Sequence, residues 1–134
     1  MSSAISTILE KFRCGDEENA FYDLLELPGE LLPDLIQSFY AEKESHVRAL
    51  LVKVAWERKE NGIAPFLNRA LEIPDELVWQ QALDGLVAFA SPEVHEILLN
   101  ARAREFADTT LTNRFRLWLE EAIQQVEFEL RAKR

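Results

Sequence analysis

The chain has 134 residues, a hydrophobic fraction of 48% and a formal net charge of −9. This length is typical of one domain with one core, and so high a hydrophobic fraction excludes a disordered tail. No apolar run approaches the roughly 20 residues that cross a bilayer, and the single cysteine, Cys14, excludes both an intramolecular disulfide and a thiolate metal cluster.

The sequence predicts an all-α chain, since it has neither sustained apolar–polar alternation nor β-branched clusters bounded by hairpin turns. Turn residues separate the helices at Gly15, Pro28-Gly29, Asn61-Gly62 and Pro74-Asp75. Connections of two to four residues predict that neighbouring helices are antiparallel. The seven or eight expected helices lie near residues 3–14, 16–27, 30–42, 46–60, 62–73, 75–90, 92–105 and 109–131.

Side chains that can cap a helix support three of these starts. Ser91 is followed by a proline and a glutamate, which is the pattern of an N-cap serine, a proline at the first helical position and an acid in the first turn. We expect Ser45 to cap the helix that begins at residue 46, and Asp16 to cap the second helix.

The apolar faces of two helices differ in width. In 75–90 the apolar side chains fall in one arc, with Gln80, Gln81 and Asp84 opposite, which is typical of an amphipathic helix. In 46–60 the apolar arc covers most of the circumference. This helix is therefore predicted to be covered on more than one side and to be the most interior one.

An internal repeat of about 31 residues is suggested by overlaying two predicted hairpins. A shift of 31 aligns Val47 with Val78 and Ala70 with Ala101, and a shift of 32 brings residues 31–39 over 63–71. One helix pair cannot bury its own apolar stripe, so stacked pairs would share a core. An irregular helical bundle is the alternative, because amphipathic hairpins share some apolar matches by chance.

The stretch VWQQALDGLVAFASPEVHEILLNA, residues 78–101, resembles a unit of the HEAT-like (armadillo-type) helical-repeat family, and VRALLVKVAWERKENGIAPFLNRA, residues 47–70, resembles it less closely. Trp79 after Val78 departs from the family pattern, and no aspartate–arginine ladder runs through the units. The resemblance covers residues 16–105. It implies a single domain over 1–134, folded as a short right-handed α-α superhelix. Residues 1–15 and 106–134 would be capping helices, and the second helix of each hairpin would line a concave face.

The candidate reactive side chains do not form a recognisable catalytic or metal site. His95 lies one step off the predicted buried stripe and lacks the second histidine of a zinc helix. His46 follows two acids at a helix start, and Cys14 precedes an acidic run, whereas a reactive thiol needs an electropositive setting. Glu120 and Glu121 point to different sides of a helix. We therefore expect no catalysis, no cofactor and no metal.

Binding to another protein is the function that remains. An acidic chain repels phosphate backbones and favours encounter with a basic partner. We therefore expect a protein partner of basic character, and neither nucleic acid nor membrane. On the second helices, the polar residues opposite the buried stripe are the expected contacts. They are Asp34, Gln37, Asn68, Glu72, His95, Glu96 and Asn100.

The three tryptophans, Trp56, Trp79 and Trp118, fall on apolar arcs and are expected in the core. A tryptophan left exposed would instead mark a binding hot spot.

Three functional hypotheses stay open. A small acidic helical-repeat protein resembles immunity proteins that neutralise a basic toxin, and an adaptor or subunit of a larger complex is the second reading. The third is a HEAT-like enzyme, either an alkylpurine DNA glycosylase or a bilin lyase. The absence of any basic residue in 75–100 disfavours a DNA-binding groove, and the chain is short for a bilin lyase.

The location is predicted from the N-terminal stretch and the cysteine content. MSSAISTILEKF has neither the basic n-region nor the continuous apolar h-region of a secretory signal. A lone cysteine is typical of a reducing compartment. We therefore expect a cytoplasmic protein.

Overall fold

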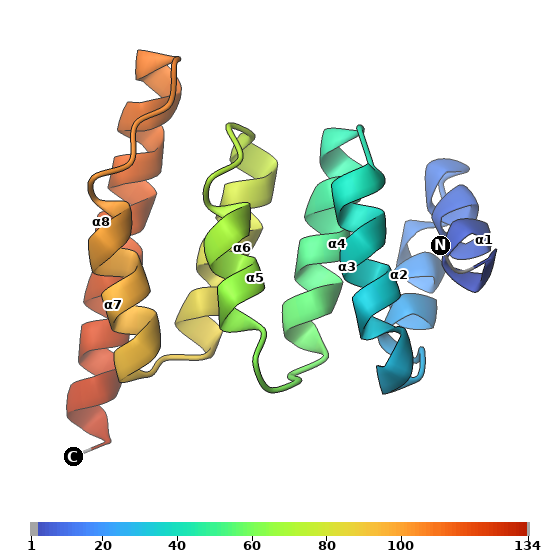
Figure 1. The fold of residues 1–134 in the computed structure, drawn as a ribbon, viewed down its shortest axis with the longest axis horizontal. Coiled ribbons are helices and arrows are strands. Elements are labelled where there is room, and N and C mark those ends of the chain that lie inside the picture. The colour runs from blue at the N-terminus through green and yellow to red at the C-terminus, as the bar shows by residue number, and fades with distance from the viewer. Residues whose placement is uncertain (1–2, 134) are drawn as a thin grey trace. The chain divides into compact units, whose positions relative to one another are not determined.

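The computed structural model describes residues 3–133, and this part of the chain is all-α, as predicted (Figure 1). It contains eight α-helices and one short 3-10 helix, and no strand is found between residues 3 and 133. The helices are α1 (Ser3–Arg13), α2 (Glu17–Leu25), η1 (Gly29–Leu31), α3 (Leu32–Ala41), α4 (Ser45–Glu57), α5 (Ala64–Ala70), α6 (Glu76–Ala88), α7 (Pro92–Ala101) and α8 (Thr109–Ala132). No helix in this range combines the length and the apolar composition needed to cross a membrane.

The helix bounds agree with the predicted ones to within about three residues, except at the end of α7. That helix ends at Ala101, four residues before the predicted end at 105. α4 ends at Glu57 rather than at Asn61-Gly62, because Lys59 adopts a left-handed backbone with φ of 56°. The Lys59 N–H then donates to the carbonyl of Trp56 at 3.1 Å and closes the helix.

Two of the predicted helix signals are confirmed in their geometry. The Ser91 hydroxyl accepts a hydrogen bond from the Val94 N–H at 3.1 Å and so caps α7. Gly15 has φ of +100° and its N–H donates to the Phe12 carbonyl, while the Asp16 N–H donates to the Lys11 carbonyl, both at 3.1 Å. These two bonds form a Schellman motif, which needs the left-handed conformation that glycine adopts freely.

The other two predicted caps need correction. Ser45 is itself the first residue of α4, and Glu44 occupies the N-cap position without a side-chain cap bond. Asp16 stands at the N-cap of α2, as predicted, but its side chain makes no cap bond to the helix backbone. It accepts a hydrogen bond from the Asn19 side chain at 2.9 Å instead. A side-chain partner has therefore replaced the backbone N–H at this helix start.

The chain divides into two compact units, one ending at Asn61 and the other beginning at Gly62. In the first unit α1 packs on α2, α3 packs on α4, and α2 lies beside α4. The prediction that α4 is covered on more than one side is confirmed, because its buried side chains occupy most of its circumference. Its buried residues are Val47, Leu50, Leu51, Val52, Val54 and Ala55.

The second unit has the same kind of arrangement. α5 packs on α6, α7 packs on α8, and α6 lies beside α8. α7 and α8 are antiparallel (Figure 1), whereas α6 and α8 run in the same direction, since Arg114 near the start of α8 lies 3.4 Å from Glu76 at the start of α6. Trp79 is fully buried in this core, and its ring meets that of Phe115 edge to face with centroids 5.3 Å apart.

The two units group the helices differently from the predicted hairpins. The hairpin predicted over 46–73 has one helix in each unit, and within the units the closely packed consecutive pairs are α1/α2, α3/α4, α5/α6 and α7/α8. The HEAT-like superhelix therefore stays a prediction, while the all-α class is established.

Candidate functional site

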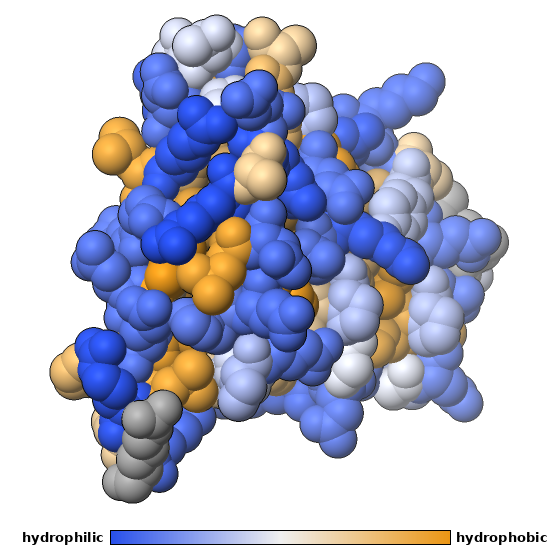
Figure 2. All heavy atoms as spheres, turned by 60° about the vertical axis from the view of Figure 1, so that its left-hand side comes forward, coloured by the Kyte–Doolittle hydropathy of each residue, from blue (hydrophilic) through white to orange (hydrophobic). Residues whose placement is uncertain are grey.

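The exposed apolar side chains of the second unit concentrate on α8. Trp118 is 42% exposed, Phe128 is 63% exposed, and Leu117 is also open to solvent. Figure 2 shows apolar atoms breaking a mainly hydrophilic surface on the side that carries α7 and α8. Contiguous exposed apolar patches are typical of interaction sites, and Trp118 is an exposed tryptophan of the kind associated above with a binding hot spot.

A groove runs between α6 and α8, wholly within the second unit. It consists of two adjoining hollows of about 180 and about 460 Å³, which share Val87, Glu121 and Gln125. We refer to the two hollows together as the α6/α8 groove. Its lining residues are Leu83, Asp84, Val87, Trp118, Glu121, Ala122, Gln124, Gln125, Phe128 and Glu129.

Helical spacing explains why these side chains share one groove. Trp118, Glu121, Ala122 and Gln125 follow one another at steps of three, one and three residues, so they occupy one side of α8. Trp118 also meets the buried ring of Trp79 edge to face, with centroids 6.3 Å apart. One side of its indole is therefore held by the core while the other faces solvent.

The carboxylates of α8 divide into two sets by the side they face. Glu120 and Glu127 face α7 and are paired there, the first with Arg102 at 2.8 Å and the second with His95 at 3.0 Å. Glu121 lines the groove and makes no ion pair with any residue from 3 to 133, and the same is true of Glu129. The groove lining contains no lysine, arginine or histidine.

The pair between Arg102 and Glu120 also shifts proton affinities. The guanidinium donates through Nε to one carboxylate oxygen at 2.9 Å and through Nη2 to the other at 2.8 Å. These hydrogen bonds lower the pKa of Glu120 and raise the pKa of Arg102, because they favour the charged form of each group. Both side chains are about half exposed, so the effect on stability is small.

The contact residues expected from the sequence lie elsewhere. Asp34 and Gln37 are on α3 in the first unit. In the second unit Asn68 is on α5, and Glu72 lies two residues beyond the end of that helix. None of these four is buried, and none lines the α6/α8 groove. Glu72 lies 3.6 Å from Arg104, in the segment between α7 and α8.

The three expected contacts on α7 also lie outside the groove. Glu96 and Asn100 are exposed, and His95 is half-buried. Nε2 of His95 lies 3.0 Å from a carboxylate oxygen of Glu127, so this histidine joins α7 to α8. The structure therefore gives His95 a polar contact between two helices.

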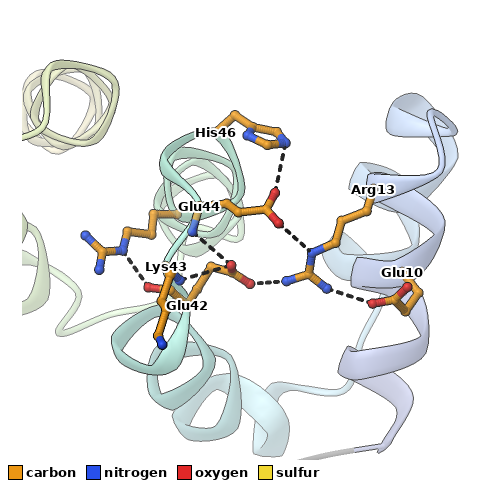
Figure 3. A network of polar contacts seen from close by, with 7 residues as sticks. Glu10, Arg13, Glu42, Lys43, Glu44 and His46 are labelled. Carbon is orange, nitrogen blue, oxygen red and sulfur yellow. Dashed lines mark hydrogen bonds and ion pairs between the residues drawn. The ribbon is translucent and has the colours of Figure 1, made fainter.

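The first unit carries a polar network around Arg13 (Figure 3). Its guanidinium contacts the carboxylates of Glu10 at 3.0 Å, Glu44 at 3.6 Å, and Glu42. Glu42 also accepts hydrogen bonds from the backbone N–H groups of residues 43 and 44, both at 3.0 Å. His46 lies 3.5 Å from Glu44. The network ties α1 to the connection between α3 and α4, which is a structural role.

A separate hollow, outside the α6/α8 groove, lies between α2 and α4 in the first unit. Lys53 lines it, with Nζ 4.8 Å from the centroid of the Phe21 ring and 3.9 Å from Glu57. This hollow also holds two acids and the exposed ring of Tyr22. Because a cation already sits over its aromatic floor, it has less unbalanced negative charge than the α6/α8 groove.

The groove presents three kinds of chemical group. Its lining provides carboxylates, side-chain amides and aromatic faces. From residue 3 to residue 133, no three His, Cys, Asp or Glu side chains are placed to hold a metal ion. Apolar contact and negative charge are therefore what the groove can present to a partner.

Sequence reasoning placed all three tryptophans in the core and overlooked Phe128. Trp79 is buried, Trp56 is half-buried and Trp118 is exposed. The available signal lay in α8 itself, where Leu117, Trp118 and Phe128 fall outside the buried stripe. That stripe contains Phe115, Leu119, Ala122, Ile123 and Val126.

Comparison of the chain with protein-family models, with curated proteins and with solved structures finds no match.

Proposed function

We propose that this chain is a non-catalytic protein-binding module that takes a basic partner in the α6/α8 groove. One observation carries the proposal: the groove combines an apolar floor and an exposed tryptophan with the carboxylates of Glu121 and Glu129, and no cation lines it. Glu121 and Glu129 make no ion pair with residues 3–133, so they are available to a partner.

The two components of the groove would contribute differently to binding. Burial of Trp118 and Phe128 would supply most of the affinity, because large aromatic side chains dominate interface energetics. The carboxylates would select the partner and accelerate its approach, because complementary charge affects specificity and association rate more than affinity. The net charge of −9 would also attract a basic partner and accelerate its approach.

Neutralisation of a basic toxin by an immunity-type inhibitor is a sharper form of this proposal. Its support is the combination of small size, acidity and a groove without cations. A subunit of a larger complex would use the same groove for a permanent partner. An inhibitor should bind one basic protein and abolish its activity, whereas a subunit should co-purify with several proteins.

The HEAT-like stack and the cytoplasmic location belong to the proposal as well. The helix pairs packed within each unit are compatible with such a stack, and helical-repeat proteins commonly present extended binding surfaces. The single cysteine of the chain supports the location, because a lone cysteine is typical of a reducing compartment.

Quantitative affinity capture tests the proposed function. The wild-type chain and the Trp118→Ala and Phe128→Ala variants are immobilised in parallel and exposed to host lysate. Bound proteins are then compared by mass spectrometry. We expect at least one basic protein to be retained by the wild type and lost from both variants.

Leu77→Ala provides the matched control, because Leu77 is exposed and apolar but lies outside the groove. Capture of the same proteins in the same amounts by wild type, groove variants and control would overturn the proposal.

A further inference from the structure

We infer that the occupant of the α6/α8 groove is an amphipathic helix of the partner, with lysine or arginine along the edge of its apolar face that meets α8. This inference rests on the proposed function and specifies the element that enters the groove. It is carried by the shape of the groove, by the polar atoms in its lining and by the distribution of its charges.

The shape fits a third helix. α6 and α8 lie side by side in the same direction, and side-chain ridges of a further helix pack into the groove between such neighbours. Trp118 and Phe128 are ten residues apart, about 15 Å along the axis of α8 at 1.5 Å per residue. A partner helix of about three turns covers that distance with apolar residues at i, i+3, i+7 and i+10.

The polar atoms of the lining favour a helix over an extended peptide. An extended segment would place about five residues along 15 Å, and the carbonyl groups of those residues would need hydrogen-bond donors. The lining offers few donors, which are the amides of Gln124 and Gln125 and the indole of Trp118, beside three carboxylates. A helix satisfies its own backbone and needs none of them.

The charges set the composition of the helix. Asp84 stands on the α6 side of the groove, whereas Glu121 and Glu129 stand on the α8 side. A helix in the groove would meet the carboxylates of Glu121 and Glu129 along its α8 edge, which calls for basic residues on the flank of its apolar stripe that faces α8. A second copy of the chain is disfavoured, because a two-fold contact through this groove would place like charges opposite one another.

The test uses a set of synthetic peptides of about 14 residues. The first has leucines at the four helical positions given above and lysines on one flank of the leucine stripe. The second contains the same residues in scrambled order, the third replaces lysine by glutamate, and the fourth carries a central proline, which breaks a helix. Fluorescence anisotropy measures binding, and amide chemical shifts locate it on the intact chain.

We expect only the first peptide to bind well and to shift the amides of α6 and α8. Trp118→Ala or Phe128→Ala should weaken it at least about tenfold, as for interface hot spots. The double variant Glu121→Gln/Glu129→Gln should weaken binding of the first peptide less than the aromatic variants do, and it should reduce the salt dependence of that binding. Leu77→Ala and Glu93→Gln, which alter residues outside the groove, should bind like the wild type. Far-UV circular dichroism confirms that each variant is folded.

Several results would overturn the inference. If the proline peptide binds as tightly as the first peptide and Phe128→Ala still abolishes that binding, the helical form is rejected. The proposed function would then remain. If the glutamate peptide binds as tightly as the lysine peptide, the basic flank is rejected. Loss of binding in Tyr22→Ala, with Trp118→Ala unaffected, would move the occupant to the first unit. If no peptide binds, the helical occupant is rejected, while the capture experiment decides separately on the proposed function.

Discussion

At the scale of single residues, the first unit depends on an arginine that sequence inspection did not single out. The Arg58 side chain is only 6% exposed. Its Nη1 donates to the carbonyls of Leu24 and Leu25 at 3.1 and 3.3 Å, and its Nη2 lies 3.0 Å from Glu60. The guanidinium therefore caps the last turn of α2, where carbonyl groups lack helical partners and a cation is favoured.

Replacing Arg58 by alanine should destabilise the chain by roughly 2 to 3 kcal/mol, because buried carbonyl groups lose a charged donor. The stability of Arg58→Lys should lie between that of Arg58→Ala and that of the wild type, because an ammonium group cannot reproduce the planar arrangement of guanidinium donors. Urea unfolding measures both changes. Arg69→Ala, at an exposed position on α5, is the control and should change stability little. An unfolding midpoint for Arg58→Ala equal to that of the wild type would contradict this role.

The pair between Arg102 and Glu120 predicts a dependence on acid. Because the pKa of Glu120 is lowered in the folded chain, its contribution is complete above the unfolded pKa of about 4.3 and disappears as the pH falls through the lower folded value. At pH 7 the melting temperature of the wild type should therefore be slightly higher than that of Glu120→Gln. This difference in melting temperature should vanish in stronger acid. Thermal unfolding at several pH values checks this, and a difference that is constant down to about pH 2 would refute it.

At the scale of elements, α8 depends on the residue before it. The Asp108 carboxylate accepts hydrogen bonds from the N–H groups of Thr110 at 2.9 Å and Leu111 at 3.2 Å. This cap begins a helix of 24 residues, whose buried side packs on α6 and α7 and whose exposed side forms one wall of the groove. The position of the groove therefore follows from where α8 starts.

Asp108→Ala should lower the free energy of unfolding by about 1 kcal/mol, the usual effect of losing an N-cap. Asp108→Asn should lower the free energy of unfolding less than Asp108→Ala does. Asparagine retains the accepting oxygen and loses only the negative charge, which is favourable at a helix N-terminus. Denaturant unfolding monitored by circular dichroism measures both. The assignment fails if the asparagine and alanine variants are equally destabilised.

The elements were largely predictable, and the site was not. Helical periodicity, and local signals such as Gly15 and Ser91, depend only on residues that are close in sequence. The helices that they indicate could therefore be predicted correctly. The end of α4 was predicted too late, because Lys59 takes a left-handed conformation that is uncommon for lysine. The end of α7 was also predicted too late, since no glycine or proline marks it in the sequence. The groove needs α6 beside α8, a pairing of helices that are not consecutive, and single-sequence periodicity says nothing about such pairs.

At the scale of the whole molecule, charge should control how quickly the chain meets its partner. The association rate constant of the basic helical peptide should fall as salt rises, because the Debye length shortens from about 10 Å at 0.1 M to about 3 Å at 1 M. Its dissociation rate constant should change less, since apolar contact holds the bound state. Stopped-flow mixing separates the two rates. An association rate that is indifferent to salt would exclude electrostatic steering.

The contact between Trp118 and Trp79 has a spectroscopic consequence. One indole is half open to water and the other is sealed in the core, with ring centroids 6.3 Å apart. A partner that covers the groove would remove water from Trp118 and move its emission to shorter wavelength, whereas the emission of Trp79 would stay in place. The chain thus carries its own optical reporter of occupancy, and no label has to be introduced into the groove to follow it.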